Sequence, residues 1–199
     1  MTIKLNKNQI DEAVEILKSG GLVAFPTDTV FGLACKMDKE PIKRVYEVKG
    51  RDFNKALPVM CDGKDMIESV AYVSDDAQKI MDKLMPGALT IVYKKKEEVE
   101  DYVTQGKDTI GIRVPDDDWI LELIGKVNHP IMVTSANVSG EGSLLKWEDV
   151  YACMNDKIEA IVCEDARGEM SSTIVDVTGE VKVLREGPIS MEQILECLK

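Results

Sequence analysis

Cationic, hydroxyl and amide side chains recur at the ends of the predicted strands of this sequence and at the end of one predicted helix. They are Thr27, Thr29, Lys49, Arg51, Lys55, Thr109, Arg113, Ser135, Asn137, Ser171, Ser172 and Arg185. Arginine offers a planar fork that matches a carboxylate or a phosphate, and lysine adds a mobile point charge. If these segments converge, they form a cleft for a multiply charged anion beside a small polar co-substrate. The alternative is that the hydroxyl and amide groups cap turns and that the arginines pair with surface acids.

Two units near the start of the chain would position the first of these side chains. Residues 22–25 read as a buried strand that ends at Pro26, and a hydroxyl-rich turn follows at residues 27–29. A helix is predicted from Pro41 to Gly50, where a residue without a Cβ lets the chain turn between two of the cations. A polar turn beside a cationic helix end is how α/β proteins usually build a ligand crevice.

The rest of the chain alternates between predicted strands and helices. The predicted strands are 57–61, 88–93, 109–114, 131–133, 158–163, 173–177 and 181–184. The predicted helices lie within 8–20, 66–71, 75–84, 118–123, 147–154 and 190–198. This mixture predicts an α/β fold, with a single domain over residues 1–199 built around a mixed sheet.

The composition argues against several classes of protein. The chain has 199 residues and a formal net charge of −11, which disfavours binding of nucleic acid or anionic membrane by the surface as a whole. Its five cysteines include no C-x-x-C pair, which favours buried thiols in a reducing cytosol. No run of apolar residues is long enough to span a bilayer. A single histidine, His129, argues against a Ser-His-Asp triad, and any nucleotide must bind without the common glycine-rich phosphate loops.

Seven short motifs occur in order along nearly the whole chain. They are FPTDTVFGL (25–33), KGR (49–51), PGALT (86–90), GIRVP (111–115), TSANVSG (134–140), ST (172–173) and LREG (184–187). Each motif is weak alone, but together they resemble the YrdC family of threonylcarbamoyl-AMP synthases. The chain looks like the short form of that family, without an additional C-terminal domain.

The resemblance implies a fold and a reaction. The expected fold is one open, twisted mixed sheet flanked by helices, with a basic concave face. The expected reaction joins L-threonine, bicarbonate or CO2, and ATP into threonylcarbamoyl-AMP and pyrophosphate, with Mg2+ arriving on ATP rather than held by protein ligands. The product would pass to a cytoplasmic system that modifies adenosine in tRNA.

The resemblance also assigns roles to individual residues. It places the ATP phosphates at Lys49, Arg51, Lys55 and Arg185, and it makes Lys49 and Arg51 catalytic. It places the rest of ATP at Thr109, Asn137 and Ser143, the last on a lid. It places L-threonine at Thr29, Arg113, Ser135 and Ser172, with Arg113 on the carboxylate. The chain departs from the family pattern at Phe31 (usually Tyr), Asp52 and Ala56 (often Pro) and Met60 (often His).

The sequence is also compatible with two other functions. The same basic face could belong to an RNA-binding module, which would bind tRNA with a steep salt dependence. The chain could also be a paralogue with another substrate, such as the carbamoyl-adenylate domain of hydrogenase maturation, where carbamoyl phosphate replaces threonine and bicarbonate.

Overall fold

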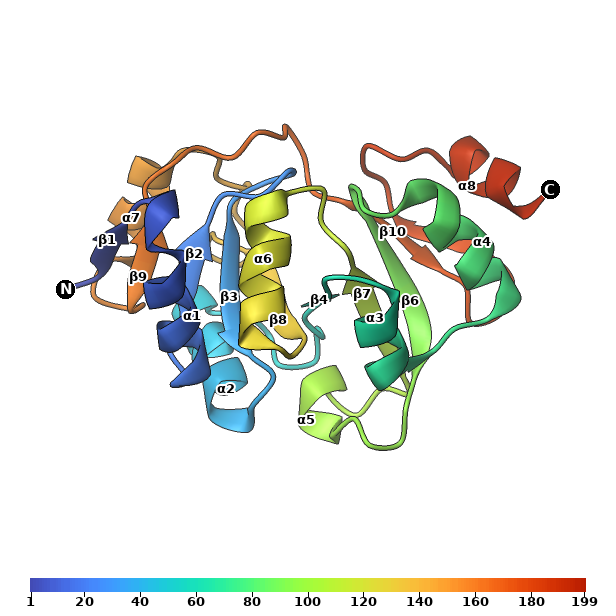
Figure 1. Ribbon diagram of the computed structural model, residues 1–199, viewed down its shortest axis with the longest axis horizontal. Helices are drawn as coiled ribbons and strands as arrows, with labels where there is room; N and C mark the ends of the chain where they lie inside the picture. Colours follow the sequence, from blue (N-terminus) through green and yellow to red (C-terminus); the bar gives the residue numbers. More distant parts are fainter.

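The computed structural model describes residues 1–199 and contains one continuous mixed sheet with helices packed against it (Figure 1). The strands are β1 (Ile3–Leu5), β2 (Val23–Phe25), β3 (Gly32–Lys36), β4 (Val59–Met60), β5 (Ala71–Tyr72), β6 (Leu89–Lys95), β7 (Thr109–Arg113), β8 (Ile131–Ser135), β9 (Ala160–Val162), β10 (Thr173–Asp176) and β11 (Lys182–Arg185). Their order across the sheet is β1-β9-β2-β3-β8-β4-β7-β6-β10-β11, and β5 pairs with β6. Neighbouring strands run both parallel and antiparallel, which confirms the predicted open mixed sheet.

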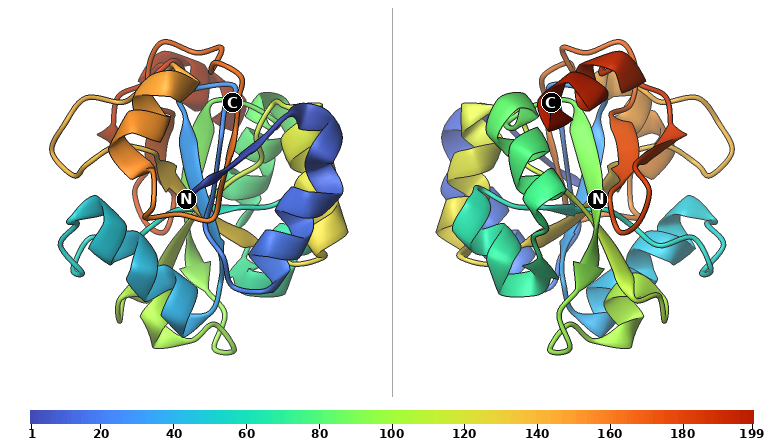
Figure 2. Two further views of the ribbon diagram at one scale, coloured as in Figure 1. Left: turned by 90° about the vertical axis from the view of Figure 1, so that its left-hand side faces the viewer. Right: turned by 90° about the vertical axis from the view of Figure 1, so that its right-hand side faces the viewer.

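The helices lie on both sides of this sheet. They are α1 (Ile10–Lys18), α2 (Lys39–Lys49), α3 (Lys64–Val70), α4 (Asp75–Leu84), α5 (Asp101–Thr104), α6 (Asp118–Val127), α7 (Trp147–Met154) and α8 (Met191–Leu198), and a 3-10 turn, η1 (Lys7–Gln9), precedes α1. Helices α1 and α6 lie side by side on one face (Figure 1). Helices α2 and α7 lie on the opposite face (Figure 2).

In the half of the sheet formed by β2, β3 and β8, both faces are packed against helices. Phe25, Ala34 and Val133 belong to a buried cluster with residues of α1 and α6. Leu33 and Met132, the next residues along their strands, belong to a second cluster with residues of α2. Successive side chains of a strand point to opposite faces, so this half has an apolar residue at nearly every position.

In the half formed by β6, β7 and β10, only one face is packed against helices. Side chains such as Ile91, Ile112 and Val175 are buried in one cluster with residues of α3, α4 and α8. The side chains between them face the other way, and they include Thr90 and Arg113. That second face is lined mainly by polar and cationic groups, so it is available to a ligand.

Several elements match their predictions because their signals are local. Helix α7 spans the predicted residues 147–154, and Ser74 caps α4 by accepting a hydrogen bond from the backbone N–H of Ala77 at 3.2 Å. Helix α2 ends at Gly50, whose φ of 58° lies in the left-handed region. Strands β1, β3 and β5 and helix α5 were not predicted, and residue 71, expected at the end of a helix, begins β5. None of the helices has the length and apolar character needed to cross a bilayer.

Candidate active site

A cavity of about 450 Å³ lies over the polar face of β6, β7 and β10. Five cationic side chains line it, namely Arg51, Lys55, Lys107, Arg113 and Arg185. The only carboxylate in its lining is that of Asp176. Because the whole chain carries a net charge of −11, this concentration of positive charge is local and favours an anionic ligand.

Alternate positions of the strands bring these groups together. Thr109 and Arg113 lie on the same face of β7 as Gly111 between them, and Thr90 projects from the neighbouring strand β6. The β2–β3 turn and the end of β8 close the other side, where Gly32 pairs with Ser135. The cavity therefore lies across a face of the sheet rather than along one edge.

Arg113 is the most deeply buried cation of the lining, with a relative exposure of 4%. Its Nε donates to the carbonyl of Gly87 at 2.9 Å, Nη1 to the hydroxyl of Thr29 at 2.7 Å and Nη2 to the carboxylate of Asp28 at 2.5 Å. Burial lowers the pKa of Arg113, whereas the charge and hydrogen bond of Asp28 raise it. Partners from two different segments, Gly87 and the turn that holds Asp28 and Thr29, thus fix the direction of this guanidinium.

Arg185 lines the cavity from the end of β11. Its Nε and Nη2 donate to the carbonyl of Ser172 at 3.0 and 2.7 Å, and Nη2 also donates to the Ser172 hydroxyl at 3.2 Å. That hydroxyl is 2.8 Å from the hydroxyl of Thr90. Burial lowers the pKa of Arg185, and the positive charges of Arg113 and Arg51 lower it further. The three guanidinium groups therefore repel one another, and an anion placed among them would relieve that repulsion.

Arg51 stands on the loop that follows α2. Its Nε donates to the carbonyl of Lys55 at 3.1 Å and its Nη2 to the carbonyl of Ala56 at 3.3 Å. The hydroxyl of Tyr46 also donates to the carbonyl of Lys55, at 3.0 Å. These bonds hold Arg51 and Lys55 over the cavity although neither Asp52 nor Ala56 supplies the rigidity of a proline.

Lys49 is buried beneath this region and does not line the cavity, with a relative exposure of 1%. Its Nζ donates to the carbonyl of Ser135, to the carbonyl of Asn137 at 2.7 Å and to the side-chain oxygen of Asn137 at 3.4 Å. Burial, and secondly the charge of Arg51, lowers the pKa of Lys49 to about 8. The carbonyl of Lys49 also accepts from the backbone N–H of Ser139 at 2.8 Å, so this residue holds the segment after β8 from both ends.

The structure brings together most of the residues that the sequence singles out. Ten of them line the cavity: Thr27, Thr29, Arg51, Lys55, Thr109, Arg113, Ser135, Ser171, Ser172 and Arg185. Lys49 and Asn137 lie beneath it. Ser143 lies at its margin, where its hydroxyl is 3.4 Å from the hydroxyl of Ser171 in the lining.

Sequence reasoning missed three charged residues of the site: Lys107 and Asp176, which line the cavity, and Asp28, which contacts Arg113. Lys107 lines the cavity, and its only signal was its position two residues before Thr109. Asp28 does not line the cavity but binds Arg113 from behind. An aspartate in a turn is usually read as a turn residue, so its type gave no hint of this contact.

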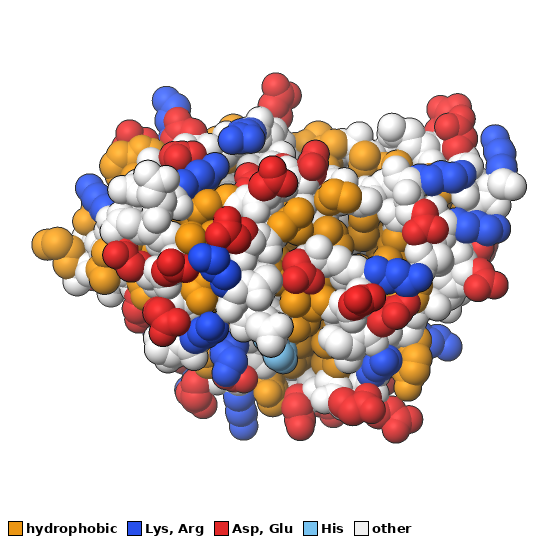
Figure 3. Space-filling view, in the orientation of Figure 1, with side chains coloured by type: hydrophobic (Ala, Val, Ile, Leu, Met, Phe, Trp, Pro, Cys, Tyr) orange, Lys and Arg blue, Asp and Glu red, His pale blue; other side chains and the backbone are white.

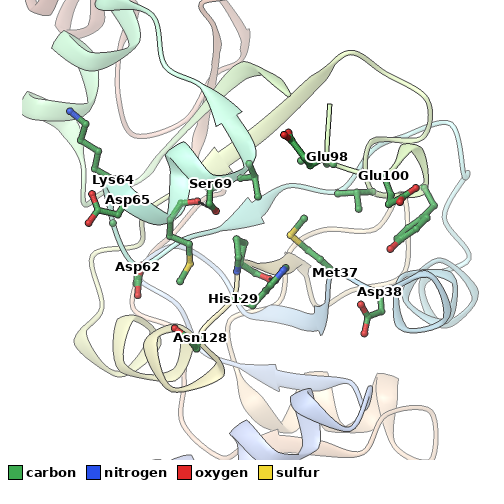
Figure 4. A pocket seen from close by; sticks show the side chains of 17 residues that line it. Met37, Asp38, Asp62, Lys64, Asp65, Ser69, Glu98, Glu100, Asn128 and His129 are labelled. Carbon is green, nitrogen blue, oxygen red and sulfur yellow. Dashed lines mark hydrogen bonds between the residues drawn. The ribbon is translucent and has the colours of Figure 1, made fainter. Parts of the chain in front are cut away.

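A second, larger cavity of about 910 Å³ lies beside the start of α3, the segment before α5 and the start of β8. It has five carboxylates in its lining, and Figure 4 shows several of them around Met37 and His129. Figure 3 shows acidic and basic side chains interspersed over this face of the molecule, with apolar surface at its centre. Since Lys64 is the only Lys or Arg of this lining, the cavity would repel an anion and does not suit the predicted ligand.

Comparisons with known proteins show the family to which the chain belongs. A family model for the Sua5/YciO/YrdC domain, described as "Telomere recombination", matches residues 15–187. A Methanocaldococcus jannaschii protein provisionally named a threonylcarbamoyl-AMP synthase is 34% identical over 201 aligned residues, covering 98% of this chain and 95% of that protein. The threonylcarbamoyl-AMP synthase of Pyrococcus abyssi is also 34% identical, over 98% of this chain but 60% of its own length.

Solved structures give the same relationship. The structure of P. abyssi Sua5 complexed with L-threonine matches with a TM-score of 0.91 and 32% identity, covering 100% of this chain and 61% of that one. The crystal structure of Escherichia coli YciO matches with a TM-score of 0.84 at 24% identity, covering 98% of this chain and 100% of that one, which supports the fold. The chain thus spans about three-fifths of the P. abyssi protein and the full length of YciO.

Proposed function

The chain belongs to the Sua5/YciO/YrdC family, and we propose that it is an L-threonylcarbamoyladenylate synthase that works in the cationic cavity. In this reaction L-threonine, CO2 or bicarbonate, and ATP give threonylcarbamoyl-AMP and pyrophosphate. The observation that carries the proposal is a cavity of about 450 Å³ with five cationic side chains and one carboxylate in its lining. In this proposal residues 1–199 form one catalytic domain, because all eleven strands belong to a single sheet.

Arg113 would bind the carboxylate of L-threonine. A guanidinium has five N–H groups. Three of those of Arg113 are engaged by Gly87, Thr29 and Asp28, so two remain for a ligand. Two parallel charge-assisted hydrogen bonds are the geometry in which arginine holds a carboxylate best. The hydroxyls of Ser135 and Ser172, which line the same cavity, would complete the polar surround of the amino acid.

The other cations would bind the triphosphate of ATP. Arg51 and Lys55 line the cavity from the loop after α2 and Arg185 from the end of β11, so a phosphate chain in the cavity would meet positive charge from both segments. Lys107 and Thr109 line the cavity at the start of β7, where they would meet the rest of the nucleotide. Mg2+ would enter as part of the MgATP substrate, because Asp176 is the only carboxylate in the lining.

These positions account for the chemistry without a covalent role for the protein. The neutral amine of threonine adds to CO2 and loses a proton, which gives a carbamate. A carbamate oxygen then attacks the α-phosphorus of ATP, and the bond between that phosphorus and the oxygen of pyrophosphate breaks. Positioning of the two substrates and cations around the charged phosphates would supply most of the rate enhancement.

The product determines what must follow. Threonylcarbamoyl-AMP is a mixed anhydride that water hydrolyses, so its consumer must be an enzyme that transfers the threonylcarbamoyl group to an acceptor before hydrolysis occurs, with AMP as the leaving group. We propose that this consumer is the machinery that transfers the threonylcarbamoyl group to adenosine of tRNA. The five cysteines of the chain are all free thiols, which supports the cytoplasm as the compartment.

The decisive experiment measures pyrophosphate release with purified protein. Turnover should require ATP, L-threonine and bicarbonate together, and turnover that ignores threonine would refute the proposal. Arg51→Ala and Arg113→Ala should each lower kcat/KM by about tenfold or more, because each removes a charge-assisted contact. Lys43→Ala, on the outer surface of α2, is the matched control and should leave turnover unchanged.

A further inference from the structure

Asp28 occupies an unusual position in the β2–β3 turn. It lies between Thr27 and Thr29, which both line the cavity, yet its own side chain is turned away from the lining and is 14% exposed. Its Oδ2 accepts from Nη2 of Arg113 at 2.5 Å and from the backbone N–H of Asp116 at 3.2 Å. Its Oδ1 is buried and accepts no hydrogen bond. All the bonding of this carboxylate is therefore directed through one oxygen, toward Arg113 and the strand end that carries it.

We propose that Asp28 is a positioning residue that aims Arg113 at the carboxylate of the substrate. The inference rests on the proposed function, since it takes L-threonine as the ligand of Arg113. Asp28 touches no substrate in this arrangement, and it acts only through the guanidinium.

The geometry around Arg113 shows what Asp28 contributes. Gly87 and Thr29 hold the guanidinium with neutral acceptors, whereas Asp28 supplies the only negative charge in direct contact with it. Because the guanidinium is 95% buried, a neutral partner in place of Asp28 would leave its charge poorly compensated. Without the carboxylate, only two neutral acceptors hold the planar guanidinium, so its two free N–H groups are held less firmly in the direction that a bidentate contact needs.

Neighbouring charges cannot take over this role. Asp116 has an exposed side chain that interacts with Arg113 only through space. Arg185 is positively charged like Arg113, and the two charges repel each other, so Arg185 cannot compensate the charge of Arg113. Asp28 and Asp116 are both carboxylates near Arg113, but only Asp28 contacts it directly. Asp116 is therefore a matched control for the loss of a nearby negative charge.

The test compares Asp28→Asn with Asp116→Asn in steady-state kinetics and in threonine binding by calorimetry. Asp28→Asn should raise the KM and the Kd for L-threonine about tenfold or more, with the KM for ATP changed by less than about threefold. Asp116→Asn should change each by less than about twofold. Asp28→Glu keeps the charge with one more methylene, so it should bind threonine better than Asp28→Asn, and it also serves if the asparagine variant does not fold.

A double-mutant cycle separates positioning from general loss of structure. If Asp28 acts through Arg113, Asp28→Asn should add little to the threonine KM of an Arg113→Lys variant. Full additivity of the two changes, or an equal rise of the threonine and ATP KM values in Asp28→Asn, would overturn the inference. A wild-type protein that does not bind threonine would refute the proposed function and this role with it. Normal threonine binding by Asp28→Asn would refute this role alone.

Discussion

The buried ammonium of Lys49 gives a prediction about stability that does not depend on the reaction. Lys49 has a relative exposure of 1%, and burial and the charge of Arg51 lower its pKa to about 8. In the unfolded chain a lysine has a pKa of about 10.4. Between these two values the unfolded state binds the proton that the folded state has lost, so stability from this group rises with pH. Below pH 8 both states are charged, and the folded state bears the full cost of burying the charge.

The magnitude follows from the two pKa values. The difference of about 2.4 pH units corresponds to about 3 kcal/mol over the whole window, at about 1.4 kcal/mol per unit. Between pH 7 and 9.5, wild type should gain about 2 kcal/mol relative to a Lys49→Met variant, in which this position no longer titrates. Other groups titrate in the same range, but they are common to both proteins and cancel in the difference.

The assay is urea unfolding of wild type and Lys49→Met at several pH values from 7 to 9.5, followed by circular dichroism. Lys43→Met is the matched control, since Lys43 lies on the same helix with a side chain 57% exposed. Its difference from wild type should stay constant across this range. If the difference between wild type and Lys49→Met changes by less than about 0.5 kcal/mol, the ammonium is not buried as described and the reasoning is wrong.

Two further predictions concern a close contact beside the cavity and a buried hydroxyl next to Ser172. Gly168→Ala should raise the KM for L-threonine about tenfold, because a Cβ at this position would lie 2.2 Å from the carbonyl oxygen of Thr29 and displace that turn. Gly142→Ala, where a Cβ would meet open space, is the kinetic control. An unchanged KM in Gly168→Ala would contradict the contact. Thr173→Val should lower the free energy of unfolding by about 2 kcal/mol, because the buried Thr173 hydroxyl donates to the carbonyl of Ile189 at 2.7 Å and accepts from its N–H at 3.0 Å. Thermal unfolding checks the second prediction, and Thr173→Ser, which keeps the hydroxyl, should retain most of the stability.

The sequence predicted elements whose signals are local and missed those fixed by distant partners. Ser74, Gly50 and the apolar stripe of residues 147–154 each mark an element by themselves. Strand β3 has no clear alternation of polar and apolar residues, because it is buried on both faces between β2 and β8. Its place depends on pairing with β8, about 100 residues later, which no local pattern reveals.

The same limit applies to the candidate site. Residue types and the family motifs identified four of the five cations that line the cavity, because cations at the ends of predicted elements are informative in an acidic chain, but they missed Lys107. They could not indicate that Lys49 is buried with its ammonium on backbone carbonyls, since lysines are seldom found in that environment. They also gave no reason to choose Asp28 over other turn aspartates, because its role comes from a contact with Arg113, far away in sequence.

The outermost strand has a consequence for how ligands enter and leave. Strand β11 pairs only with β10, and Leu184 within it is 53% exposed, yet Arg185 of this strand forms part of the cavity wall. Marginal strands of a sheet separate at lower energetic cost than central ones. We therefore expect β11 to separate from β10 transiently, which would widen the entrance of the cavity. A ligand that contacts Arg185 would stabilise the pairing of these two strands.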